Sequence, residues 1–165
     1  MILVAIGSNL QSKEYGSPYD NCLEVIKLIK KKFYVKQVSR FYKTEPIPKS
    51  TQPWFVNAVI EIITKNEPFV ILEELLKLEK YFKRQRKKKN EPRIIDLDLL
   101  TYNDLILNTD SLVLPHPRMH LRKFVIKPIC DLDPFWKHPL LEKSAKDILK
   151  KLANQKIFNI NQARV

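Results

Sequence analysis

The chain has 165 residues, 44% of them hydrophobic, and its 30 Lys and Arg residues against 18 Asp and Glu residues give a formal net charge of +12. This length fits one domain with its own core, and the positive charge favours an anionic partner without distinguishing a nucleotide, a nucleic acid or a membrane surface. The two glycines, Gly7 and Gly16, exclude a Walker-type phosphate loop, which needs two glycines five positions apart, and a dinucleotide-binding fingerprint, which needs three glycines. A bound polyphosphate would therefore depend mainly on side-chain cations and metal ions.

The cysteines and the N-terminus favour a cytoplasmic protein with no membrane partner. Cys22 and Cys130 stand alone, without metal-ligand or redox spacing, so no disulfide is expected. The apolar start at residues 2–6 has no basic leader and stops at Gly7, too short for a signal peptide or a membrane span. We expect residues 2–6 to form a first strand.

The next segments predict a helix and a strand. Ser17, Pro18 and Asp20 occupy the N-cap, first and third positions of a helix, and apolar residues follow at helical spacing. Residues 33–42 show an imperfect strand pattern. A helix followed by a strand is expected before residue 44.

Residues 44–53 contain three prolines and predict a long loop, because proline disfavours both helix and central strand. Residues 54–64 then alternate as a strand, in which Phe55 and Asn57 share a face. A lone Asn in a strand usually bonds to backbone, so the strand pattern alone assigns Asn57 no function.

A second amphipathic helix is predicted from residues 66–68 to about residue 82. It runs into a strongly basic segment, residues 80–90, which leads to the apolar stretch 92–100. If that stretch is a strand, Asp96 and Asp98 share one face and Ile95, Leu97 and Leu99 the other. Two neighbouring carboxylates are either solvated surface residues or metal ligands, and the stretch alone leaves both readings open.

The last third predicts short strands at residues 105–107 and 112–114 and a short helix at 144–152, with Ser144 and Asp147 at capping-box spacing. Residues 115–124 carry histidines and cations beside an aromatic side chain. A metal site at His116 and His120 is conceivable, but no third ligand is evident and phosphate contact is favoured. The order strand, helix, strand, strand, helix, strand predicts a ferredoxin-like α+β sandwich, with a mostly antiparallel sheet, helices against it and a C-terminal extension from about residue 138.

Five ordered segments resemble the 6-hydroxymethyl-7,8-dihydropterin pyrophosphokinase family, and the resemblance extends to about residue 137. They are AIGSNL at 5–10, SRFYKTEP at 39–46, QPWFVNA at 52–58, PRIIDLD at 92–98 and LPHPRM at 114–119. The resemblance implies a ferredoxin-like single domain, residues 1–165, that transfers pyrophosphate from ATP to the pterin hydroxymethyl group and releases AMP in folate biosynthesis. The implied partners are these two small molecules and no nucleic acid, and we expect a monomer.

The resemblance also implies residue roles. Asp96 and Asp98 would hold two Mg²⁺ ions bound with ATP, and Arg84 and Arg93 would be catalytic cations on the phosphates. Further ATP contacts would come from a group of scattered residues: Glu79, Arg86, Lys89, Leu99, Val113, His116 and Arg122. The pterin would be bound by Gly7, Thr44, Ile47, Phe55, Asn57 and Phe124, with the two aromatic rings stacking on it and Asn57 reading its amide-like edge.

Two other hypotheses about the function of the chain remain at this point. Basic ferredoxin-like folds also bind RNA, although the aromatic-rich RNP signature is absent and carboxylates on the sheet would repel phosphates. Alternatively, Asp96 and Asp98 are solvated strand residues with no ligand. Loss of Mg²⁺ and ATP binding on replacing either aspartate would exclude this last reading.

Overall fold

The computed structural model describes residues 1–82, 93–152 and 155–160. At its centre is a six-stranded antiparallel sheet with the order β5-β1-β4-β3-β8, in which β2 also pairs with β4. The strands are β1 (Ile2–Ser8), β2 (Tyr34–Val38), β3 (Tyr42–Thr44), β4 (Phe55–Ile63), β5 (Asp96–Tyr102) and β8 (Ile157–Asn159). A separate two-stranded sheet joins β6 (Leu107–Asn108) to β7 (Val113–Leu114).

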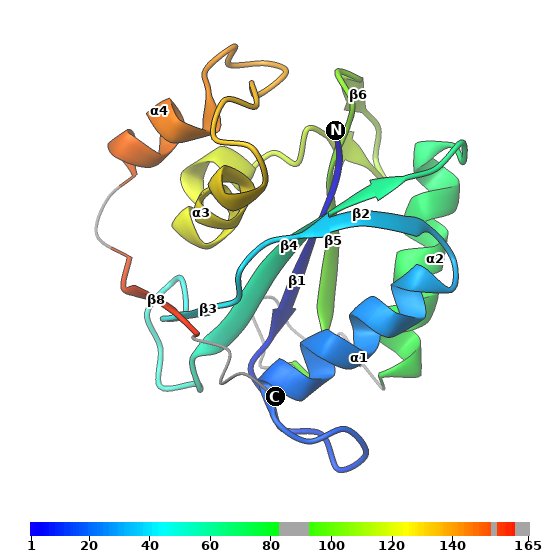
Figure 1. Cartoon of the computed structure of the whole chain (residues 1–165), viewed down its shortest axis with the longest axis vertical. Coiled ribbons are helices and arrows are strands. Elements are labelled where there is room, and N and C mark those ends of the chain that lie inside the picture. Colours follow the sequence, from blue (N-terminus) through cyan, green and yellow to red (C-terminus); the bar gives the residue numbers. More distant parts are fainter. Residues whose placement is uncertain (83–92, 153–154, 161–165) are drawn as a thin grey trace.

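Helices cover both faces of the large sheet (Figure 1). α1 (Pro18–Lys30) and α2 (Pro68–Tyr81) lie on one face, and α3 (Lys123–Leu132) and α4 (Ala145–Lys151) lie on the other, with the short 3-10 helix Met119–Leu121 just before α3. The order of β1, α1, the β2/β3–β4 hairpin, α2 and β5 confirms the predicted ferredoxin-like α+β sandwich. No helix in the described ranges is long and apolar enough to cross a membrane.

Strand alternation divides the core in two. Ile2, Val4 and Ile6 of β1 join the cluster under α1 and α2, whereas Leu3 joins the cluster with Val125 of α3 and others. Both clusters are fully buried apolar groups, so the sheet is packed on both sides. The predicted C-terminal extension from about residue 138 packs onto the same domain. Ala145 and Ile148 of α4 are part of the second cluster, and β8 extends the sheet.

Local signals explain several element boundaries. The Ser17 side chain accepts a hydrogen bond from the Asp20 backbone N–H, and Asp20 in turn accepts from the Ser17 N–H, which confirms the predicted capping box of α1. Ser144 caps α4 in the predicted position. The proline-rich segment after β3 forms neither helix nor strand, as predicted.

Three boundaries differ from the predictions. The strand predicted over 33–42 is two strands, β2 and β3, because regular pairing with β4 is interrupted after Val38, where the Ser39 hydroxyl accepts from the Val59 N–H. The strand predicted over 92–100 begins only at Asp96, and β1 continues through Gly7 to Ser8 instead of ending at residue 6. Two elements were not predicted: α3, which contains Pro128, and β8 in the C-terminal tail.

Candidate active site

The pairing of β4, β1 and β5 places the predicted pterin contacts Gly7 and Asn57 in one row with the predicted metal ligands Asp96 and Asp98. Gly7 of β1 lies opposite Asp96 of β5 on one side and opposite Asn57 of β4 on the other. Asp98 lies opposite Ala5. Because successive side chains alternate between faces, both carboxylates and Asn57 project toward the face that carries α3. The glycine between Asp96 and Asn57 adds no side chain, so the floor of the row stays open.

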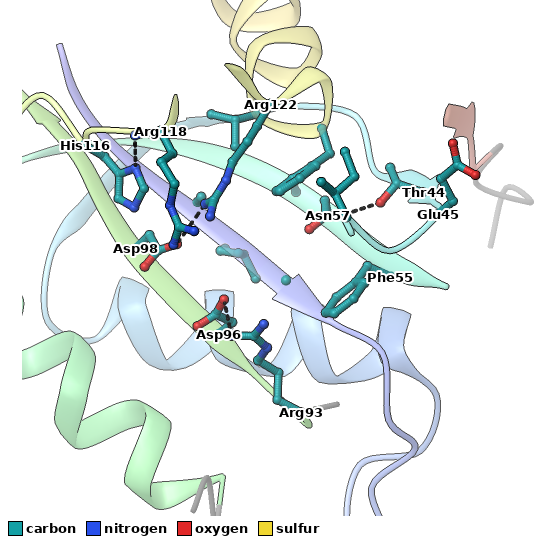
Figure 2. Close-up of a pocket in the computed structure, with 17 residues that line it drawn as sticks. Thr44, Glu45, Phe55, Asn57, Arg93, Asp96, Asp98, His116, Arg118 and Arg122 are labelled. Atoms are coloured by element: carbon teal, nitrogen blue, oxygen red, sulfur yellow. Dashed lines mark hydrogen bonds and ion pairs between the residues drawn. The ribbon is translucent and has the colours of Figure 1, made fainter. Parts of the chain in front are cut away.

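A cavity of about 280 Å³ lies over this row, and Figure 2 shows its lining. It brings together most of the predicted site residues: Gly7, Thr44, Ile47, Phe55, Asn57, Arg93, Asp96, Asp98, His116, Arg122 and Phe124. These residues come from β1, from β3 and the loop after it, from β4, from β5 and the segment before it, and from the first turn of α3 and the segment that leads into it. The proximity of residues so far apart in sequence supports the predicted site, while their individual roles stay predictions.

Two arginines separate the carboxylates from the aromatic rings. The Arg93 guanidinium lies 3.0 Å from the Asp96 carboxylate and 5.7 Å from the centre of the Phe55 ring. The Arg122 guanidinium lies 3.9 Å from Asp98 and 5.5 Å from the Phe124 ring centre. Each cation therefore contacts one acidic and one aromatic group, so the positive charge lies at the boundary between the two halves of the cavity.

Arg93 is held by backbone contacts through a buried asparagine that was not predicted as a site residue. The Asn9 side chain accepts from the Arg93 backbone N–H at 2.8 Å and donates to the Pro53 carbonyl at 3.0 Å. The Asn9 backbone N–H donates to the Arg93 carbonyl at 3.1 Å. Asn9 thus joins the end of β1 to the segments before β4 and β5. The only sequence signal for it was its place in the motif AIGSNL.

The Arg93 Nε atom is buried and has no hydrogen-bond partner within the described residues. A guanidinium donor in a partly buried position is stabilised by an acceptor, and a phosphate oxygen is a suitable one. Arg93, which carries this Nε–H donor, lines the cavity. Arg93 therefore keeps one guanidinium donor without an acceptor among the described residues.

His116 is held in one tautomer. Its Nδ1 accepts a hydrogen bond from the Arg118 backbone N–H at 3.2 Å, so the ring proton of the neutral form is on Nε2. Burial, reinforced by the charges of Arg122 and Arg118, lowers the pKa of His116 to about 4. At neutral pH, His116 is therefore an uncharged Nε2–H donor on the side of the cavity that carries Asp98 and Arg118.

Arg118 and Arg122 add positive charge next to Asp98 (Figure 2). Burial, followed by repulsion from Arg118, lowers the pKa of Arg122. An anion between these cations would relieve their mutual repulsion. Arg118 was part of a quoted motif but was not predicted as a site residue, and neither was Glu45, which also lines the cavity.

The opposite side of the cavity is suited to a flat, hydrogen-bonding ligand. The Asn57 amide donates to the Thr44 hydroxyl at 2.6 Å, and both residues are buried. An amide has two N–H groups and one oxygen, so this bond uses only part of its capacity. Phe55, Phe124 and the half-exposed Ile47 supply apolar surface around it.

Three predicted ATP contacts do not line the cavity. Glu79 is buried, and its carboxylate accepts from the Leu97 backbone N–H at 2.8 Å, between the two aspartates of β5. The Leu99 side chain is 3% exposed and lies in the core under α1 and α2, so a direct contact would have to use its backbone. Val113 is half-buried in β7. The predicted contacts Arg84, Arg86 and Lys89 lie outside the described residues.

The carboxylate pair fits a hard divalent cation. The Asp96 and Asp98 side chains are 21% and 33% exposed, so their oxygens are reachable from the cavity that they line. Within the described ranges no cluster of three or more His, Cys, Asp and Glu side chains could hold a metal. Two carboxylates alone suit an ion such as Mg²⁺, which keeps water and phosphate oxygens as its other ligands.

Comparisons with known proteins show the family and the fold of this chain. The family model described as 7,8-dihydro-6-hydroxymethylpterin-pyrophosphokinase matches residues 3–134. A crystal structure of a Plasmodium falciparum HPPK-DHPS triple mutant covers 91% of this chain and 44% of its own, with a TM-score of 0.71 and 15% identity. At this identity the structural likeness concerns the fold.

Curated relatives match over most of this chain. The chain is 32% identical over 154 residues to a folic acid synthesis protein of Dictyostelium discoideum, covering 93% of this chain but 23% of that protein. It is 31% identical over 160 residues to the 2-amino-4-hydroxy-6-hydroxymethyldihydropteridine pyrophosphokinase of Haemophilus influenzae, covering 96% of both. The chain thus spans less than a quarter of the first relative and nearly all of the second. It belongs to the 7,8-dihydro-6-hydroxymethylpterin-pyrophosphokinase family.

Proposed function

We propose that this protein transfers the pyrophosphoryl group of ATP to the hydroxymethyl oxygen of 6-hydroxymethyl-7,8-dihydropterin, releasing AMP, in folate biosynthesis. One observation carries the proposal beyond family membership. A carboxylate pair and an aromatic pocket with an amide lie in the same cavity, separated by Arg93 and Arg122. This is the order in which a nucleotide polyphosphate, the transferred group and a flat acceptor would have to lie.

The acceptor side offers stacking and edge recognition. Phe55 and Phe124 would stack on the pterin ring, because aromatic rings gain from offset or edge contacts beyond the area that they bury. Asn57 would pair with the amide-like edge of the pterin, with its own orientation fixed by Thr44. Closing this side around the acceptor would also exclude water, which otherwise competes for the pyrophosphoryl group.

The phosphate side offers fixed donors and charge. In the transfer, the acceptor hydroxyl loses its proton and its oxygen forms a bond to the β-phosphorus, while the bond from that phosphorus to the α-β bridging oxygen breaks and AMP carries that bridging oxygen away. Negative charge on the phosphate oxygens would be matched by Arg93, Arg118 and Arg122 and by the Nε2–H of His116. These groups hold ATP and acceptor in line, which is the main contribution that a protein can make to phosphoryl transfer.

Asp96 and Asp98 are the residues that would hold Mg²⁺, two ions with ATP bound, and the ions would neutralise phosphate charge. In the structure both carboxylates face arginines. Cations at the carboxylates would compete with these ion pairs and leave Arg93 and Arg122 to the phosphates. We further propose that the protein acts as a cytoplasmic monomer without a nucleic-acid partner.

A binding titration tests this proposal. A non-hydrolysable ATP analogue and the pterin are titrated by calorimetry, with and without Mg²⁺. We expect Mg²⁺ to strengthen analogue binding at least about tenfold in the parent and much less in Asp98→Asn, because the variant loses a metal ligand. Equal analogue affinity with and without Mg²⁺ would contradict the metal role, and salt-dependent RNA binding that the pterin leaves unchanged would favour a nucleic-acid function.

A further inference from the structure

The C-terminal segment, residues 155–160, lies beyond the part of the chain that the family model matches, yet it contacts the wall of the cavity. Strand β8 pairs with β3, so that Ile157 lies opposite Thr44. The Lys156 backbone N–H donates to the Glu45 carboxylate at 2.9 Å, and the Glu45 N–H donates back to the Lys156 carbonyl at 3.3 Å. In Figure 2 this segment, coloured red, passes beside Glu45.

Gln155 joins this segment to two separate walls of the cavity. Its Nε2 donates to the Glu45 carbonyl at 3.1 Å, and its Oε1 accepts from the Phe124 backbone N–H at 3.2 Å. Glu45 and Phe124 both line the cavity, but Gln155 itself does not. The Gln155 residue is 8% exposed; its bond to Glu45 is buried and its bond to Phe124 is partly buried, which limits competition from water.

The bond to Phe124 meets a need of α3. The first N–H groups of a helix lack intrahelical acceptors, and a Ser, Thr, Asp or Asn side chain at the N-cap usually supplies one. The N-cap of α3 is Arg122, whose side chain has no acceptor and makes no capping bond. Gln155, more than thirty positions further along the chain, supplies the missing acceptor.

We propose that Gln155 is a positioning residue for the acceptor side of the site. It sets the start of α3, and with it Phe124, at a defined distance from the Thr44–Glu45 wall. The inference rests on the proposed function, because it assigns Gln155 to the pterin rather than to ATP. It follows that the C-terminal tail tunes pterin affinity without touching the ligand, and that residues outside the family match complete the pocket.

The test compares two replacements of Gln155 with a matched replacement elsewhere. Gln155→Met keeps the length of the side chain and removes both hydrogen bonds. Gln155→Glu keeps the acceptor for the Phe124 N–H and loses the donor to Glu45. Gln37→Met is the control. The Gln37 side chain in β2 donates a hydrogen bond of 2.7 Å to Glu61 in β4, and neither residue lines the cavity.

Dissociation constants for the pterin and for a non-hydrolysable ATP analogue with Mg²⁺ are measured for each variant, with thermal unfolding alongside. We expect Gln155→Met to weaken pterin binding about tenfold and Gln155→Glu about threefold, with analogue binding changed by less than about twofold. Gln37→Met should leave both constants near those of the parent. This separation of the two ligands is what a merely structural role would not produce.

Unchanged pterin affinity in the Gln155 variants, or equal weakening of both ligands, would overturn the inference. If Gln155→Met does not fold, Gln155→Glu decides the question by the same criterion. A parent protein that binds the ATP analogue but no pterin would instead overturn the proposed function, and the inference with it. A parent that binds pterin normally while the variants do not differ from it would overturn the inference alone.

Discussion

The same strands contribute side chains to both faces of the central sheet, but the two faces differ in what those side chains do. On the face under α1 and α2, β1 and β5 contribute Ile2, Val4, Ile6, Leu97 and Leu99, all buried in one apolar cluster. On the opposite face, Leu3 and Leu100 pack under α3 and α4. Toward the first residue of β5, the side chains on this face are instead Asp98 and Asp96.

This difference shows how a small domain places charge on a sheet without losing its core. The change occurs at the start of α3, where the helix no longer covers the sheet and the cavity begins. Because alternation separates the faces, an aspartate at position 98 and a leucine at position 99 have nearly independent tasks. Substitutions on the open part of one face should change ligand binding and turnover, and those on the other should change stability.

The largest effect is expected from Asp96→Asn. The replacement keeps the shape of the side chain but removes a carboxylate that would hold Mg²⁺, so turnover of ATP with the pterin should fall at least about a thousandfold. Asp104→Asn is the control, since Asp104 is exposed on the turn after the same strand. Steady-state kinetics measure both. A loss of less than about tenfold in Asp96→Asn would show that this carboxylate is a surface residue.

A smaller effect is expected from Gly7→Ala, which tests the open floor between the two halves of the site. A methyl group at Gly7 would stand 3.0 Å from the Asn57 oxygen and 3.9 Å from Asp96 Cβ. Asn57 would have to shift, so pterin affinity should fall about tenfold by calorimetry, as expected when a buried hydrogen-bonding group is displaced.

The control for this variant is Gly16→Ala. Gly16 has a φ of +106°, and a methyl group there would meet the Asp20 carboxylate at 2.9 Å; neither residue lines the cavity. This change should lower stability and leave pterin affinity unchanged. The same affinity loss in both glycine variants would argue for a general disturbance of the fold.

Leu99→Ala tests the opposite face and should leave ligand binding nearly unchanged. Leu99 is buried in the cluster under α1 and α2, so truncation should reduce the free energy of unfolding by about 2–4 kcal/mol, measured by urea denaturation. Michaelis constants for ATP and pterin should stay within about twofold of the parent. A selective rise in the constant for ATP would instead support the predicted contact between Leu99 and the nucleotide.

The smallest effect concerns pH. The pKa of His116 is lowered from 6.5 to about 4 by burial and by Arg122 and Arg118, so between these values the unfolded chain binds a proton that the folded chain does not. The contribution of the neutral His116 ring to the free energy of unfolding is therefore complete above pH 6.5 and is lost as the pH falls through about 4. Urea denaturation over this window should show a shallower pH dependence in His116→Asn than in the parent, and equal slopes would contradict the buried neutral ring.

Periodicity in the sequence was sufficient for the order of strands and helices along the chain up to β5 and for the shared face of Asp96 and Asp98, because both follow from local patterns. It missed α3, although Val125, Ile126 and Ile129 have helical spacing, since Pro128 and the preceding cations obscure the pattern. It also missed β8, whose three residues form a strand only by pairing with β3. The links made by Asn9 and Gln155 depend on contacts between distant segments, and no local pattern carries them.

Product analysis tests the central claim most directly. The protein is incubated with ATP, Mg²⁺ and 6-hydroxymethyl-7,8-dihydropterin, and nucleotides and pterins are separated by chromatography. Transfer of a pyrophosphoryl group predicts AMP and the pterin diphosphate in equal amounts, with no AMP when the pterin is omitted. Formation of ADP as the nucleotide product, or ATP consumption that does not depend on the pterin, would contradict the proposed function.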